Sequence, residues 1–188
     1  MSSHSSQQQD NRLIVGITGH IGAGKTSVGK YLNRTYGFYY IRYSQVLAEW
    51  KAQDGANKAD LQYVGWEVMA GGMQQELNSR LIAQMPPHGD CAVDGLRHPI
   101  DYAALKNTFS TNFRLLYMES TQENRWERLK AKYPKLTDFR DADSRPVEQQ
   151  IDSLKSEAVA VLENNRSLKD LYSKVDSVLN RIRQGGPK

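Results

Sequence analysis

The chain has 188 residues, of which 39% are hydrophobic and 24% charged, and 25 Lys and Arg against 21 Asp and Glu give a net charge of +4. No stretch approaches the ~20 consecutive apolar residues that cross a bilayer, and no dense Lys/Arg block is present, so we expect neither an integral membrane protein nor a nucleic-acid-binding protein. The single cysteine, Cys91, excludes an internal disulfide framework and favours a reducing, cytoplasmic location.

Helical and strand-like segments alternate along most of the chain. Short apolar runs predict strands at residues 13–18, 38–41, 91–94, 113–118 and 159–162. Helical segments are expected between them at residues 25–35, 44–51, 60–85, 100–107, 122–132, 146–156 and 167–183. This alternation favours an α/β fold with a parallel sheet covered on both faces. We expect residues 12–183 to form a single domain, with disordered segments at 1–11 and 184–188 because these are polar or glycine-rich.

The first strand-to-helix turn carries the sharpest chemical signal. Residues 19–26 read GHIGAGKT, which fits the phosphate-binding P-loop pattern G-x-x-x-x-G-K-[ST]. Glycines let successive backbone N–H groups turn toward a phosphate, and the helix that follows adds the positive end of its dipole. We expect Lys25 to reach the β- and γ-phosphates of ATP and the Thr26 hydroxyl to hold Mg²⁺. The predicted nucleotide-binding residues of this turn are Gly19, Gly22, Ala23, Gly24, Lys25, Thr26 and Ser27.

Other chemical patterns carry less weight. Residues 57–60 spell N-K-x-D, a guanine-reading string of GTPases, but its place soon after the P-loop favours Asp60 as a helix N-cap instead. The histidines show no metal-ligand spacing, so we expect no zinc, and His20 is expected to act through its backbone. Cys91 is interpreted as a buried strand residue.

A second candidate site follows the third predicted strand, at Asp94-Gly95-Leu96-Arg97. A carboxylate at the carboxyl end of a parallel strand faces the ligand crevice. Asp94 is therefore expected to hold Mg²⁺, directly or through water, or to accept a proton from the nucleophile. Arg97 is expected to clamp the phosphate of the acceptor, because its guanidinium binds phosphate bidentately. The alternative is a turn at Asp94-Gly95 with a solvated Arg97.

A basic segment follows the fourth predicted strand. Arg125 and Arg128 share one helix face, and Arg140 and Arg145 follow in a polar stretch. Phosphoryl transfer spreads negative charge that cations on a closing lid can stabilise, so we predict a lid at about residues 133–146, with Arg125, Arg128 and Arg145 as catalytic residues. The alternative is a solvated helix in which Glu127 pairs locally.

Several motifs together resemble a known family. IVGITGHIGAGKTSV, VDGLRHPIDYAALK, RWERLK and the F-x-x-x-D-x-R element at residues 139–145 are similar to the P-loop nucleoside monophosphate kinases and dephospho-CoA kinases, in particular to a nucleotide kinase-like microbial branch. The resemblance spans residues 13–182. It implies a three-layer αβα P-loop NTPase fold with strand order 2-3-1-4-5, an acceptor-binding insert at about residues 42–86 containing the long 60–85 helix, and lid arginines on the transferred phosphate. It also implies adenine contacts from residues 164–167, among them Asn164 and Asn165.

The acceptor side departs from that family pattern. The branch has an acidic residue and an Arg after the second strand, where this chain has Gln45 and Ala48, and Pro146 replaces a Glu after the lid Arg. Arg42 and Tyr43 are predicted to bind substrate. Together with Trp66 and Met69 they would form a different acceptor pocket, although aromatic and Met side chains at this spacing also suit a core.

The sequence therefore predicts a kinase that moves the γ-phosphoryl group of ATP, with Mg²⁺, to a small phosphorylated acceptor. Because a phosphate acceptor needs no dedicated base, the absence of an acid at position 45 favours a nucleoside or deoxynucleoside monophosphate over dephospho-CoA. The alternative from another functional class is a nucleotide-binding regulator with weakened catalysis. A metabolic NTPase is the third hypothesis. The sequence leaves open the acceptor's identity, ATP or GTP preference, and a monomeric or homodimeric state.

Overall fold

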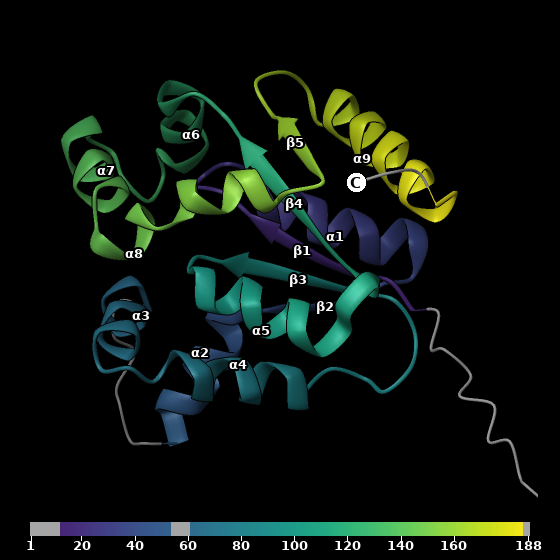
Figure 1. Cartoon of the computed structure of the whole chain (residues 1–188). Helices are drawn as coiled ribbons and strands as arrows, with labels where there is room; N and C mark the ends of the chain where they lie inside the picture. The colour runs from purple at the N-terminus through teal and green to yellow at the C-terminus, as the bar shows by residue number, and fades with distance from the viewer. Residues whose placement is uncertain (1–11, 54–60, 186–188) are drawn as a thin grey trace, which may run out of the picture.

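A twisted parallel sheet of five strands forms the centre of the molecule (Figure 1). The computed structural model describes residues 12–53 and 61–185. The segment 1–11, the N-K-x-D string at 57–60 and the last residues of the tail, 186–188, lie outside the described residues. The strands are ordered β2-β3-β1-β4-β5, as the family resemblance implied, and their bounds are β1 Ile14–Thr18, β2 Tyr39–Arg42, β3 Cys91–Leu96, β4 Phe113–Glu119 and β5 Ala160–Glu163.

Alternation along the central strands builds a core on each side of the sheet. Ile14 of β1 faces one apolar cluster, while Val15 and Ile17 face the other. All five residues of β1 are buried, as expected for a strand covered on both faces. Gly16 leaves room for the ring of Phe113, which an added Cβ would meet at 2.8 Å. The central strand is therefore fixed from both sides and holds the turn that follows it in place.

Helices cover both faces of this sheet (Figure 1). On one face lie α1 and α9, whose buried residues belong to the same cluster as Val15; their bounds are Lys25–Tyr36 and Leu168–Arg183. The other face is covered by α2 Tyr43–Gln53, α4 Gln74–Ala83 and α5 Pro99–Phe109. His98 caps α5 by accepting from the Ile100 N–H, and Pro99 begins the helix as predicted.

The predicted long helix at 60–85 is wrong, because two helices occupy this stretch. In the described part of it, α3 spans Leu61–Ala70 and α4 begins at Gln74. Gly71 and Gly72 separate them, and Gly72 has a φ of +70°, which a continuing helix does not allow. The break lets α3 lie away from the sheet, opposite the lid, while α4 packs on α2 and α5 (Figure 1).

The predicted lid contains more helix than its polar sequence suggested. After α6 (Gln122–Leu129), the chain forms α7 (Leu136–Asp143) and α8 (Pro146–Gln149), and then the 3₁₀ helix η2 (Ile151–Glu157) in place of one helix to Ser156. A second short 3₁₀ helix, η1 (Ser110–Asn112), leads into β4. Phe139 and Ala142 bury one side of α7, which explains why this segment is helical.

Two smaller observations complete the fold. Cys91 is buried in β3, as predicted. Among residues 12–53 and 61–185, no helix has the length and apolar character of a membrane span.

Candidate functional site

The P-loop lies between β1 and α1 and takes its shape from glycines in the left-handed backbone region. Gly24, the residue before α1, has a φ of 104°, and a Cβ there would collide with the amide of Asn164. Gly19 has a φ of 136°, and a Cβ there would collide with the carbonyl of Met118 on β4. A side chain at either position is thus excluded both by conformation and by neighbours.

Lys25 is buried beneath this loop. Its Nζ donates to the carbonyl oxygens of Gly19 at 2.5 Å and His20 at 3.0 Å. Burial lowers the pKa of Lys25 to about 8, and the positive charge of Arg97 acts in the same direction. The ammonium group therefore lies at the centre of the loop, where the sequence predicted a cation for the phosphates of ATP.

Thr26 and Asp94 meet at the neighbouring edge of the site. The Thr26 hydroxyl donates to Asp94 Oδ2 at 3.0 Å, and the Tyr40 hydroxyl donates to the same oxygen at 2.7 Å. Burial, followed by the charge of Asp94, raises the pKa of Tyr40. A hydroxyl and a carboxylate that touch each other supply the oxygen donors that Mg²⁺ prefers, so this pair fits a magnesium ion that would neutralise charge on the phosphates of ATP.

A pocket of about 580 Å³, its open mouth included, lies beyond Asp94 on the β2–β3 side. Its lining combines apolar and polar side chains from α2, α3, α4, the β3–α5 turn and α8: Tyr43, Ser44, Leu47, Gln62, Gly65, Met69, Gln74, Leu77, Gly95, Arg97, His98, Asp101 and Val147. Arg97, Tyr43 and Met69 thus lie where the sequence predicted acceptor contacts. Arg42 is outside this lining, at the end of β2 in register with Asp94.

A buried polar network supports the floor of this acceptor pocket. The Tyr43 hydroxyl donates to Asn78 Oδ1 at 2.5 Å, and Gln74 Nε2 donates to Asp101 Oδ1 at 2.5 Å. Asp101 Oδ2 also accepts from the backbone N–H groups of Arg97 and His98, at 3.0 Å each, and its burial raises its pKa. The network fixes the turn that carries Arg97. Sequence reasoning missed it, because its members are separated by up to 58 residues.

The three predicted lid arginines each have a protein partner. Arg125 pairs with both carboxylate oxygens of Asp143 and donates to the Ile21 carbonyl at 3.1 Å. Arg128 donates to the carbonyls of Gly22, at 3.2 Å, and Asn164. Arg125 and Arg128 therefore lie against the P-loop from α6, and their predicted action on the transferred phosphate stays a prediction.

Arg145, the third of these arginines, contacts α3. It donates to Gln62 Oε1 at 2.9 Å and so connects the lid to α3. Its predicted role in transition-state stabilisation would require it to exchange this partner for a phosphate.

Asn164 and Asn165 both form hydrogen bonds with main-chain groups of neighbouring turns. Asn164 Nδ2 donates to the Ala23 carbonyl in the P-loop at 2.9 Å. Asn165 Oδ1 accepts from the Ser120 hydroxyl and the Thr121 N–H, at 2.9 Å each. The Asn164 bond ties the β5–α9 turn to the P-loop, and the Asn165 bonds tie it to the β4–α6 turn. Both are compatible with the predicted adenine contacts and add a structural role that the sequence did not indicate.

Glu148 lies between the P-loop and the acceptor pocket. Its side chain is fully buried. Glu148 Oε2 accepts from the Ile21 N–H at 3.0 Å, while Oε1 accepts from Gln62 Nε2 at 3.3 Å and pairs with Arg97. Sequence reasoning missed this residue, although its place soon after Arg145, at the end of the predicted lid, was the available signal.

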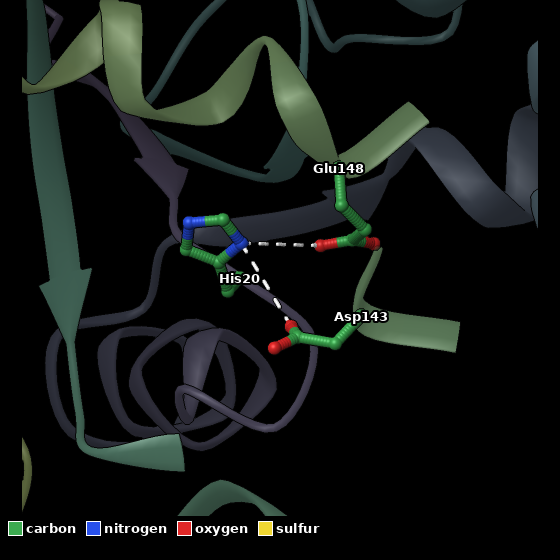
Figure 2. A group of neighbouring side chains, drawn as sticks. All are labelled: His20, Asp143 and Glu148. Carbon is green, nitrogen blue, oxygen red and sulfur yellow. Dashed lines mark ion pairs between the residues drawn. The ribbon is translucent and has the colours of Figure 1, made fainter. Parts of the chain in front are cut away.

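The imidazole of His20 lies next to the carboxylates of Glu148 and Asp143, as Figure 2 shows. Its Nδ1 lies 3.8 Å from Glu148 and 3.9 Å from Asp143, and its Nε2 is 2.9 Å from Asp152. Within the described ranges, His20, Asp143 and Glu148 are close enough to share a metal ion. The two carboxylates already hold Arg125 and Arg97, however, so we interpret the cluster as an ion-pair network that joins the lid to the P-loop.

The comparisons with known proteins agree with this P-loop architecture. A family model described as an AAA domain matches residues 15–148, which include the P-loop, Asp94, helices α2, α3 and α4, and Glu148. A comparison with curated protein sequences gives no match.

Several solved structures share the fold. A gluconokinase from Sinorhizobium meliloti 1021 is similar with a TM-score of 0.62 at 14% identity, covering 94% of this chain and 95% of that one. A shikimate kinase from Acinetobacter baumannii, in complex with shikimate, is similar with a TM-score of 0.57 at 16% identity, covering 95% and 97%. TT1252 from Thermus thermophilus has a TM-score of 0.56 at 18% identity, covering 90% and 97%. At these identities the likeness concerns the fold alone.

Proposed function

Because the chain belongs to the AAA domain family, whose model covers the P-loop and the acceptor helices, we propose that it is an ATP- and Mg²⁺-dependent kinase of a small molecule. One observation carries the proposal: the P-loop with Lys25 and the acceptor pocket with Arg97 adjoin, and Glu148 contacts both. Phosphoryl transfer needs a donor and an acceptor held next to each other among cations, and this arrangement supplies both.

The residues divide by role in this proposal. Lys25 and the loop amides other than the Ile21 N–H, which Glu148 already accepts from, hold the phosphates of ATP, and Thr26 and Asp94 hold Mg²⁺. Arg97 orients the acceptor. Arg125 and Arg128, which already lie against the P-loop, stabilise charge on the transferred phosphoryl group.

A nucleoside or deoxynucleoside monophosphate is the acceptor that we favour. Arg97 lines the pocket and offers its guanidinium to a phosphate. A second hollow, lined by Gln62, Tyr63, Trp66, Arg145 and Pro146, adjoins that pocket at Gln62. Tyr63 and Trp66 are 54% and 38% exposed there, and exposed aromatic rings suit a stacked base. Trp66 is thus available for the acceptor instead of being part of the core.

A catalytically weakened nucleotide-binding regulator is the second candidate. The observation that favours it is Gln45, which is exposed and donates to Glu49 at 3.0 Å instead of supplying a carboxylate to the pocket. For both candidates we keep the sequence prediction of a cytoplasmic location. We also keep the prediction that the partner is a small molecule and that the protein binds neither nucleic acid nor membrane. Whether it is a monomer or a homodimer stays open.

Measurement of ADP production separates the candidates. The protein is incubated with Mg·ATP and, in turn, with each NMP, each dNMP, dephospho-CoA, shikimate and gluconate, the last two because the similar structures are kinases of those names. We expect ADP to appear with an NMP or dNMP. Tight ATP binding without ADP from any acceptor would favour the regulator, and ADP that does not depend on an acceptor would favour a metabolic NTPase.

A further inference from the structure

Glu148 holds two kinds of donor that P-loop proteins offer to phosphate. One of its oxygens accepts from a backbone N–H of the P-loop, at Ile21, and the other pairs with the guanidinium of Arg97. Loop N–H groups and arginine forks are the typical donors for phosphate oxygens. A carboxylate has the same sign of charge and also presents oxygen acceptors, so it satisfies both donors at once.

The charges around Glu148 leave no room for a second anion beside it. Three cations, Lys25, Arg97 and Arg125, face three carboxylates, Asp94, Asp143 and Glu148, and the imidazole of His20 lies 3.8 Å from Glu148. Glu148 is also fully buried, so a phosphate that took the same donors without displacing it would place like charges together away from water. Either the carboxylate or the phosphate binds these groups.

We propose that Glu148 competes with the phosphate of the acceptor for Arg97 and the P-loop N–H of Ile21, and that this competition makes Glu148 a specificity-determining residue. The proposal rests on the kinase function proposed above. An acceptor that brings only a carboxylate offers Arg97 the kind of anion that it already has. A phosphate monoester brings three oxygens and nearly two negative charges, and so replaces Glu148. The competition therefore selects phosphate-bearing acceptors over carboxylate-bearing and neutral ones.

The position of Glu148 in the chain makes the exchange feasible. It lies on α8, which has four residues and contacts α3 on the acceptor side. Of its other contacts, the bond from Gln62 Nε2 is long at 3.3 Å and His20 Nδ1 lies 3.8 Å away, so both contribute little. Release of the carboxylate therefore moves a short element and leaves α7, anchored through Asp143 to Arg125, in place.

Glu148→Gln tests the competition, because it removes the charge, keeps the shape and retains an oxygen for the Ile21 N–H. The probes are inorganic pyrophosphate and, for comparison, acetate, titrated calorimetrically into the full chain. We expect pyrophosphate to bind the variant roughly 10- to 100-fold more tightly than the wild type, the range of a charge-assisted hydrogen bond. Affinity that is unchanged or weaker in a variant of normal melting temperature would overturn the proposal.

Asp152→Asn is the matched control. Asp152 belongs to the same cluster through His20 but is 73% exposed, and its hydrogen bonds go to His20 and Tyr117 instead of Arg97. Its removal should change the affinity for pyrophosphate by less than about twofold, since an exposed charge is screened. An equal gain in both variants would show that general charge, and not competition at Arg97, controls binding, and would also overturn the proposal.

A measurement on the wild-type protein covers the case in which Glu148→Gln does not fold. Hydrogen exchange of the α8 amides, Val147 to Gln149, should become several-fold faster with saturating pyrophosphate, because Glu148 loses its partners, and should stay unchanged with acetate. Slower or unaltered exchange with pyrophosphate would contradict displacement.

Turnover distinguishes this inference from the proposed function. If Glu148→Gln loses phosphoryl transfer while its affinity for pyrophosphate is unchanged, Glu148 acts as a proton acceptor and the competition is wrong, although the kinase function stands. If pyrophosphate binds the variant more tightly but neither protein turns over any acceptor, the competition holds for anions and the kinase function fails.

Discussion

The donor side and the acceptor side of the site are built in different ways. On the donor side, Lys25 donates to the carbonyls of Gly19 and His20, a few residues away in the same loop. On the acceptor and lid side, Arg97 pairs with Glu148, and Arg145 bonds Gln62, 83 positions away. The contacts of Lys25 are thus local in sequence, although Asn164, Arg125 and Arg128 also bond the P-loop from distant elements. The contacts of Arg97 and Arg145 form only when distant helices come together.

Replacement of Lys25 by Ala should have the largest effect and tests the donor side. Without the ammonium group, phosphoryl transfer should fall by about 1,000-fold or more, because a preorganised cation at the developing charge is lost. The melting temperature should not fall, since a buried lysine whose pKa is lowered to about 8 costs stability when charged. ADP release and thermal unfolding measure the two effects.

Lys30→Ala, on the exposed side of the same helix, is the control for Lys25→Ala. Lys30→Ala should leave the rate of ADP release and the melting temperature unchanged within error. If Lys25→Ala retained turnover, the site would have to lie elsewhere in the molecule, and the contrast between the two sides would lose its basis.

Asp143→Asn tests whether the lid depends on its distant partners. Asp143 and Arg125 are about 10% and 8% exposed, so loss of this charge should reduce the free energy of unfolding by about 3 kcal/mol at pH 7. Burial alone would raise the pKa of Asp143. Hydrogen bonds from Arg125 and Gln122 outweigh this effect and lower the pKa below its usual value. Its contribution is therefore complete above the pKa of the unfolded chain and is lost as the pH falls through the lower pKa of the folded state.

The pH dependence gives the decisive comparison for Asp143. The difference in unfolding free energy between wild type and Asp143→Asn should narrow below about pH 4. Asp141→Asn, an exposed residue of the same helix, should match the wild type across the range. A difference that stayed constant down to pH 3 would mean that the ion pair does not stabilise the lid.

The comparison of the two sides also explains what the sequence could predict. Gly24, Lys25 and Thr26 are contiguous, so their geometry follows from a local pattern after an apolar strand. The strand order came from the family resemblance, and the sheet agrees with it. Glu148 gave no comparable signal, because its importance depends on α8 lying against Ile21, 127 positions earlier in the chain.

Features that the sequence did not predict also depend on contacts between segments far apart in the chain. The helix at 60–85 was expected to be continuous because its apolar pattern is continuous, yet Gly71 and Gly72 end α3 and allow it to reach the lid. The predicted role of Arg145 as a cation for phosphate stays a prediction, but its contact with Gln62 could not be predicted, because it depends on where α3 lies. A local sequence pattern thus predicts the chemistry of a side chain, but it does not predict which residue that side chain contacts in the fold.

Arg97→Lys separates the acceptor side from the donor side. Lysine keeps the charge but loses the planar fork, so the KM for the acceptor should rise by about tenfold, the loss of one good hydrogen bond to phosphate. The Kd for ATP should stay within about twofold, because the P-loop and its Lys25 are untouched. Arg34→Lys, on exposed α1 surface, provides the matched control. A change in the Kd for ATP with an unaltered acceptor KM would place Arg97 on the donor side instead.

Gln62→Ala should have the smallest effect and tests how tightly α3 and the lid are joined. Gln62 donates to Glu148 at 3.3 Å and to the Ala142 carbonyl at 3.4 Å, and accepts from Arg145 at 2.9 Å, so two of these three bonds are long. Their loss should reduce the free energy of unfolding by about 1 kcal/mol, or roughly 2–4 °C in melting temperature. Hydrogen exchange in α8 should accelerate while that of α1 stays constant, because these three bonds of Gln62 go to residues 142–148. Gln45→Ala, an exposed amide, should alter neither, and equal acceleration in α1 and α8 would show that the two sides unfold as one unit.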